Sequence, residues 1–230
     1  MKTRILFLFI LMNCSRLWSQ DSLVTLKTGS SIKEVLSTSD LFHYPQFISG
    51  KVFFRNGTRS EALMNYSRLS DQLLFINPKG DTLALADEKI TKLVVLDKDT
   101  FYYHEGFIRL VSGNSDVKLA EKQIWQVADV RKIGTHNRPT NTVAIYSYQT
   151  IMDRFGGSHN LLANEDVIVR KKAYYYFGDK YDHFVNATKK QLLLLFPKEQ
   201  NRIANYLKDN KVNFEKKDDL EKLLDFLEKK

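Results

Sequence analysis

Between residues 47 and 130, hydrophobic residues come in short runs that alternate with turn-forming residues about ten positions apart. The run 52–54 leads into Asn56-Gly57, a pair that tolerates the positive φ angles of a tight hairpin. A second run ends in a turn of Asn, Pro, Lys, Gly and Asp at 77–81. Further strands are expected at 82–86, 90–96, 100–103 and 107–111, with one or two more in 117–127. The pattern predicts an antiparallel β meander, packed as a sandwich, as a partial barrel or against a helix.

The stretch near 132–166 lacks this periodicity. Pro139 and several glycines interrupt it, so most of it is expected to be loop, with one short strand at 144–148. A long strand is expected at 165–177, where apolar residues occupy both faces. Such a strand is usually covered on both sides, and here it would be buried or lie under the loop region.

From residue 187 onward the apolar period becomes helical. The first helix is expected to end at Pro197, which cannot continue it, and a second covers 198–208. A third begins at Asp218-Asp219, whose negative charge suits a helix N-terminus. Its apolar stripe follows i, i+3, i+4, i+7 spacing and consists of Leu220, Leu223, Leu224 and Leu227. These helices either cap the sheet or form a small docking unit.

The N-terminus has the pattern of a secretory signal, with Lys2 and Arg4 before an unbroken apolar run at 5–12. That run is too short to cross a bilayer, which needs roughly 20 apolar residues. Ordinary cleavage after Gln20 is preferred, and it would deliver the protein to a bacterial periplasm or cell envelope, or secrete it. The alternative is acylation of Cys14, although the residue before it is not the small one that a lipobox requires.

Together these patterns predict an α+β fold, mostly an antiparallel β meander forming a sandwich or partial barrel, followed by about three short helices. The predicted organisation is a signal peptide at 1–20, a β-rich domain at 21–186 and a C-terminal helical segment at 187–230. The loop-rich stretch near 132–166 belongs to the β-rich domain.

Cysteine usage and charge narrow the possible partners. Cys14 is the single cysteine, so a chain cleaved after Gln20 has no disulfide and depends on its core. The formal net charge is +8, with both signs mixed along the sequence. Because nucleic-acid binders concentrate basic charge on a face or stripe, no nucleic-acid partner is expected. No segment after the signal is long and apolar enough to span a membrane.

Motifs of catalysis are missing from the sequence. It contains no Gly-x-Ser-x-Gly elbow, phosphate-binding loop, dinucleotide fingerprint or His-Glu-x-x-His pair. No catalytic residue, metal ligand or cofactor is therefore assigned. The short sequences Gly-Thr-His136-Asn and Gly-Ser-His159-Asn are weakly similar. The two histidines could meet at a shared site, but both stretches also have the composition of ordinary polar turns.

Four tyrosines are candidates for a ligand pocket or an interface: Tyr102, Tyr103, Tyr174 and Tyr175. They belong to the aromatic runs 101–103 and 174–177. Tyrosine is common at interfaces. Runs of this kind also occur where one side of a strand faces the core and hydroxyl groups reach its rim, so both interpretations stay open.

Three stretches resemble a class of poorly characterised exported envelope proteins of Bacteroidetes-type bacteria. They are the signal ending in Ser19-Gln20, the strand–turn sequence LFINPKGDTL at 74–83, and the tail from LLLFP at 193–197 through YLKDNKVNF at 206–214 to Leu220. The resemblance implies an envelope location and carries no activity with it.

The first functional hypothesis is a non-catalytic exported envelope protein that acts as an interaction or scaffold module, with an envelope protein bound through the C-terminal helices. An alternative is a carrier or sensor of a small apolar ligand held between the aromatic strands around Tyr102 and Tyr175. A hydrolase or metal enzyme that uses His136 and His159 is the least favoured hypothesis.

Overall fold

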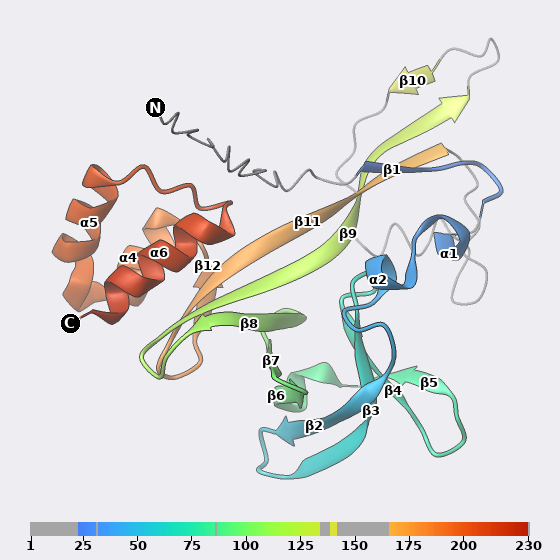
Figure 1. Ribbon diagram of the computed structural model, residues 1–230, viewed down its shortest axis with the longest axis horizontal. Helices are drawn as coiled ribbons and strands as arrows, with labels where there is room; N and C mark the ends of the chain where they lie inside the picture. Colours follow the sequence, from blue (N-terminus) through green and yellow to red (C-terminus); the bar gives the residue numbers. More distant parts are fainter. Residues whose placement is uncertain (1–22, 31, 86, 134–138, 142–165, 230) are drawn as a thin grey trace, which may run out of the picture.

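The computed structural model describes residues 23–30, 32–85, 87–133, 139–141 and 166–229 (Figure 1). In these ranges twelve strands join in one sheet, with the order β1-β11-β9-β8-β7-β6-β2-β3-β4-β5, while β10 pairs with β9 and β12 with β11. All pairs are antiparallel, and the helices gather mainly at the C-terminus, so the predicted α+β fold with a β meander is confirmed. The strands are β1 (Leu23–Leu26), β2 (Ile48–Phe54), β3 (Arg59–Ser67), β4 (Gln72–Ile76), β5 (Thr82–Ala84), β6 (Thr91–Leu96), β7 (Asp99–Tyr103), β8 (Phe107–Gly113), β9 (Val117–Ile133), β10 (Pro139–Asn141), β11 (Asp166–Asp179) and β12 (Phe184–Asn186).

The meander from β2 to β8 follows the predicted turns, with one departure from simple order. Asn56-Gly57 forms the β2–β3 turn, where Gly57 has a φ of 86°. The side chain of Asn77 organises the β4–β5 turn by accepting from the amides of Lys79 and Asp81. After β5 and the 3₁₀ turn η1 (Glu88–Ile90), the chain returns to place β6 beside β2. β2 therefore lies between β3 and β6.

Strands β2, β3, β4, β6, β7 and β8 form what we call the curled sheet. Its inner surface carries its own apolar core. Phe101 and Phe107, from neighbouring strands, are 1% and 0% exposed. Gly50 allows close packing here, because a Cβ at that position would lie 2.1 Å from Leu96 Cδ2. The curled-sheet core consists of Val52, Met64, Tyr66, Leu73, Val94, Leu96, Phe101 and Phe107.

A long two-stranded ladder of β9 and β11 extends past the curled strands at both ends (Figure 1). The expected strand at 165–177 is confirmed as β11, and 117–127 forms a single strand, β9, that continues to Ile133. Of the predicted loop-rich stretch, the structure describes only 132–133, 139–141 and 166, all of them in strands. The predicted strand at 144–148 and the signal at 1–20 lie outside the described residues.

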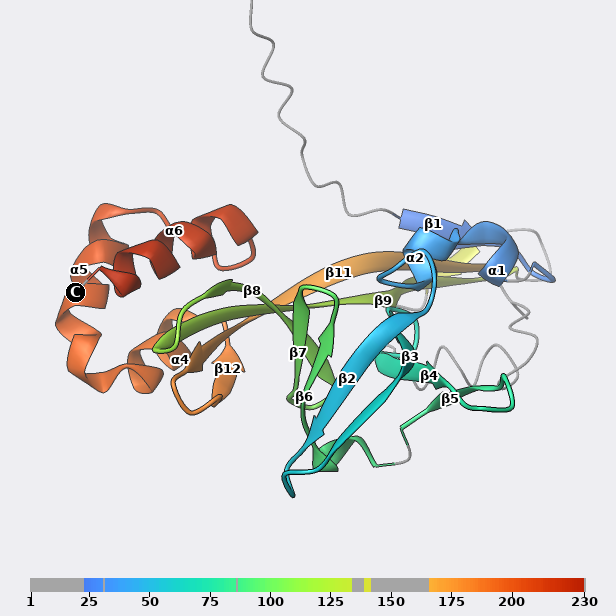
Figure 2. The same ribbon diagram turned by 60° about the horizontal axis from the view of Figure 1, so that its bottom comes forward.

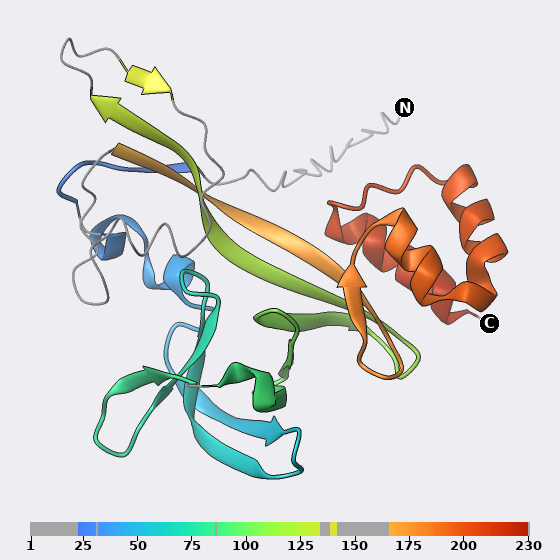
Figure 3. The same ribbon diagram turned by 180° about the vertical axis from the view of Figure 1, so that it is seen from behind.

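The C-terminal helices are α4 (Lys189–Leu195), α5 (Gln200–Asp209) and α6 (Lys217–Glu228), with the 3₁₀ turn η2 (Pro197–Glu199) between the first two. They lie at the β12 end of the ladder (Figure 3). The predicted stripe of α6 is buried with Val117 and Leu119 of β9 and Phe177 of β11. Of the two arrangements that the sequence left open, capping of the sheet is thus the one observed.

Two short helices that the sequence analysis did not predict, α1 (Ile32–Val35) and α2 (Thr38–Leu41), cover the other end of the ladder (Figure 2). Trp125 and Val127 of β9 are buried beneath them. These two residues share the face of Leu119, because side chains alternate along a strand. One face of the ladder is thus covered at both ends. No helix in the described ranges is both long and apolar enough to cross a membrane.

Candidate functional site

The linking segment 42–46, between α2 and β2, brings His43 and Tyr44 onto the curled sheet. The His43 amide donates to the Tyr66 carbonyl at 2.9 Å, and the Tyr44 amide donates to Asn65 Oδ1 at 3.1 Å. Asn65, which is 1% exposed, donates back to the Tyr44 carbonyl at 2.9 Å. The backbone of this segment is therefore held by β3, and its side chains are placed with little freedom.

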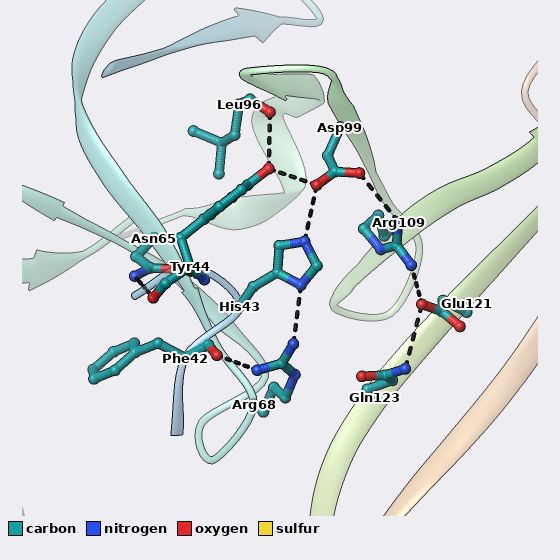
Figure 4. A network of polar contacts seen from close by, with 10 residues as sticks. All are labelled: Phe42, His43, Tyr44, Asn65, Arg68, Leu96, Asp99, Arg109, Glu121 and Gln123. Atoms are coloured by element: carbon teal, nitrogen blue, oxygen red, sulfur yellow. Dashed lines mark hydrogen bonds and ion pairs between the residues drawn. The ribbon is translucent and has the colours of Figure 1, made fainter. Parts of the chain in front are cut away.

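From His43 a continuous chain of polar contacts crosses β7, β8 and β9 (Figure 4). Arg68 Nη2 lies 3.1 Å from His43 Nδ1, and His43 Nε2 lies 2.9 Å from Asp99 Oδ2. Arg109 Nη1 donates to Asp99 Oδ1 at 3.1 Å, and its Nη2 donates to Glu121 Oε1. We call these five residues the polar clamp. It is half-buried to buried, with side-chain exposures of 5% for Glu121 and 22% for Arg109.

The neighbours of His43 fix its tautomer. Arginine nitrogens can only donate hydrogen bonds, so Nδ1 of His43 must accept from Arg68. The ring hydrogen is then on Nε2, which donates to Asp99. Burial lowers the pKa of His43 below its ordinary value of 6.5 and outweighs the opposing effect of the hydrogen bond that the ring donates to Asp99. His43 is therefore a neutral ring with both nitrogens engaged.

Asp99 is an anion that accepts hydrogen bonds from several side chains around it. Burial alone would raise its pKa, but hydrogen bonds from Tyr44, His43 and Arg109 outweigh this and lower it. The Tyr44 hydroxyl lies 2.6 Å from Asp99 Oδ2 and 2.9 Å from the Leu96 carbonyl oxygen. The pKa of Tyr44 is raised, first by burial and then by Asp99. Asp99 is thus ionised and Tyr44 neutral at ordinary pH.

Arg68 ties the linking segment to both β3 and β9. Its guanidinium donates to the carbonyls of Ser39, at 2.8 Å, and Phe42. Its backbone amide donates to the Leu41 carbonyl at 2.8 Å, and its own carbonyl accepts from the Trp125 amide at 3.1 Å. One residue therefore anchors the end of α2, the linking segment and the ladder.

The space beside the clamp is small. A cavity of about 10 Å³ lies between residues that include His43, Arg68, Arg109 and Glu121. A water molecule needs about 10–15 Å³ when cavity volume is measured in this way. A substrate or an organic cofactor therefore does not fit at this position.

The pairing of His43 with Asp99 resembles the oriented imidazole of a general base, but both ring nitrogens are engaged here. A general base needs a free nitrogen within hydrogen-bond reach of the reacting group. The second nitrogen of His43 already accepts from Arg68. Among the described residues, no three His, Cys, Asp or Glu side chains are grouped so that they could hold a metal ion. The arrangement is that of a structural clamp.

A second buried polar group lies at the β3–β4 turn. Asp71 accepts from the Tyr66 hydroxyl at 2.7 Å and from Lys122 Nζ at 2.8 Å. Lys122 also donates to the Glu105 carbonyl at 2.7 Å. Burial raises the pKa of Asp71 despite these contacts. This group fastens the turn to β9 beside the clamp.

The four tyrosine candidates are placed in separate surroundings. Tyr102 packs against Phe184 with ring centroids 5.0 Å apart, and Tyr103 lies on the opposite face of β7 and contacts Phe107. The Tyr174 hydroxyl accepts from Gln126 at 2.6 Å. The pKa of Tyr175 is raised to about 12 by burial and then by nearby carboxylates, Glu121 foremost. None of these four rings lines the cavity beside the polar clamp.

His136 and His159 lie outside the described residues, so a site shared between them stays a prediction. The polar clamp was not foreseen from the sequence, because its members come from five separate parts of the chain and have no fixed spacing. Only the charged residues inside the otherwise apolar strand β9, above all Glu121, offered a signal.

Comparisons of the chain with protein-family models, with curated proteins and with solved structures gave no match.

Proposed function

We propose that this chain is a non-catalytic exported envelope protein that acts as an interaction or scaffold module. The observation that carries the proposal is the state of His43, whose two ring nitrogens are both engaged beside a cavity of about 10 Å³. The group of side chains that most resembles catalytic machinery thus holds the fold together. The charged and apolar start of the sequence supports export.

A protein partner is proposed to bind the outer surface of the C-terminal helices. Their inner stripe is buried against β9 and β11, so it is not open to a partner. On the outer side, Leu194 of α4 is 61% exposed, whereas Leu192 of the same helix is fully buried. An exposed leucine costs the fold little to replace, and this makes Leu194 a clean probe of the surface.

The test is crosslinking in intact cells followed by separation of soluble and membrane fractions. Leu194→Glu is compared with Leu83→Glu, a matched change on β5, where the side chain is 44% exposed. We expect a crosslinked species that Leu194→Glu weakens and Leu83→Glu retains. A species that both variants retain would remove the helical surface from the proposal. If the wild-type chain forms no crosslinked species, the scaffold function itself is contradicted.

The same fractions test the location. An intact mass that begins at Asp21 in the soluble fraction supports ordinary cleavage and an envelope or secreted protein. A mass that begins at an acylated Cys14 in the membrane fraction would replace this with a lipid-anchored protein. A chain that keeps residues 1–20 would contradict export.

A further inference from the structure

Protonation of His43 is incompatible with the contacts that its ring now makes. A second ring hydrogen would sit on Nδ1, which is 3.1 Å from Arg68 Nη2. Two donors, each carrying positive charge, would then face each other. The hydrogen bond to Asp99 would survive, but Asp99 is already shared with Arg109 and Tyr44.

We propose that His43 is an acid-sensitive latch whose protonation releases the linking segment 42–46 from the curled sheet. The observation behind this proposal is the placement of a neutral ring between the guanidinium of Arg68 and the carboxylate of Asp99. Release would hydrate the imidazolium and would uncover the apolar core against which Tyr44 packs.

The charges around the ring decide the direction of the effect. The clamp contains two cations, Arg68 and Arg109, and two anions, Asp99 and Glu121, so an added proton leaves one uncompensated positive charge in a half-buried site. The other groups that face the ring carry no charge at ordinary pH. The groups facing His43 are Tyr44 on its own segment, Tyr66 on β3, Arg68 after β3, Asp99 on β7, Arg109 on β8 and Glu121 on β9.

The pH window follows from the sign of the shift. Burial lowers the pKa of His43 below 6.5 in the folded state, so an opened segment binds the proton more tightly than a closed one. The stability of the closed segment relative to the open one does not depend on His43 above about pH 6.5. It decreases as the pH falls from 6.5 toward the folded pKa. Across that window the opening equilibrium rises by up to about tenfold for each pH unit.

Hydrogen exchange on the full chain tests the latch, with wild type and His43→Gln compared at about pH 7.5 and about pH 5.5, on either side of the ordinary histidine pKa. Glutamine can accept from Arg68 and donate to Asp99, but it does not titrate in this range. The reporting amides are those of His43, Tyr44 and Arg68, which are bonded to β3 or α2. Comparison at equal pH cancels the intrinsic pH dependence of exchange.

We expect the wild type to lose protection at these amides in acid relative to His43→Gln, while the amides of α6 behave alike in both proteins. His104→Gln is the matched control. The pKa of His104 is also lowered by burial, but its ring lies against Tyr176 and Phe184, away from the clamp. This control should open like the wild type. Equal acid sensitivity in wild type and His43→Gln, or its loss in His104→Gln, would overturn the latch.

A direct titration keeps the proposal testable if His43→Gln does not fold. Nitrogen NMR of the wild-type ring should show an unprotonated Nδ1 at neutral pH and a pKa below 6.5. The linking-segment signals should change together with that titration. A His43 ring that protonates at or above 6.5 while the segment stays bonded to β3 would refute the latch.

Discussion

Arg109 joins Asp99 on β7 to Glu121 on β9, so its replacement by methionine should destabilise the protein strongly. Arg109→Met keeps most of the side-chain volume but leaves two carboxylates without their shared cation. Removal of one partner from a buried ion pair typically costs about 3–5 kcal/mol. The side chains of Arg109 and Asp99 are 22% and 20% exposed, which places the expected cost at the lower end, at about 3 kcal/mol.

Urea unfolding of the chain is the assay, because a loss of this size should lower the midpoint by about 1–1.5 M when the slope is about 2–3 kcal/mol per molar. Glu121→Met should cost a similar amount. The double variant should cost less than the sum of the two by about 2 kcal/mol, since both members of the Arg109–Glu121 pair are then absent and only Asp99 lacks its cation.

A surface pair supplies the control for the same chemistry. Lys51 and Glu61 lie 3.4 Å apart with side chains 55% and 58% exposed, so Lys51→Met should change the free energy of unfolding by no more than about 0.5 kcal/mol. If Arg109→Met cost no more than this control, the clamp would not stabilise the fold. Strict additivity in the double variant would show that Arg109 and Glu121 are energetically independent.

Two further substitutions test the cores on either side of the clamp. Gly50→Ala should cost about 1–3 kcal/mol in urea unfolding, because the new Cβ would meet Leu96 Cδ2, Met64 Cε and the Val95 carbonyl oxygen within 3.0 Å; a neutral result would mean that β2 and β6 can separate freely. Trp125→Ala should cost about 3–5 kcal/mol. Trp125→Phe should cost less, about 1–3 kcal/mol, because phenylalanine keeps a smaller aromatic ring in the core but loses the 2.9 Å hydrogen bond to the Asp40 carbonyl. Equal losses of stability for the two variants in thermal unfolding would contradict this expectation.

The parts of the fold that the sequence predicted are those whose signal is local. The leucine stripe of α6 and the Asn56-Gly57 turn each depend on residues a few positions apart, and both are present. The long strand at 165–177 was recognisable because aliphatic residues at 167–169 and aromatic residues at 174–177 place apolar side chains on both faces. In the structure β11 runs from Asp166 to Asp179, and only Val167, Val169, Phe177 and Gly178 of it are buried, so the expected burial on both faces is limited to parts of the strand.

What the sequence did not predict depends on distant partners. Strand β9 continues through Glu121 and Lys122, two charged residues that would end most apolar runs, because Arg109 and Asp71 neutralise them. The insertion of β2 between β3 and β6 is likewise a pairing choice with no local signal. The short helices α1 and α2 have only four residues each, too few for a helical period to be visible.

The polar clamp also explains how two separate cores are held as one body. Arg68 bonds to Ser39 and Phe42 beside the α1–α2 core, and through His43 it reaches Asp99 at the edge of the curled-sheet core. Its carbonyl also accepts from Trp125, whose ring fills the first of these cores. A change in the charge of His43 would therefore act on the joint between the cores.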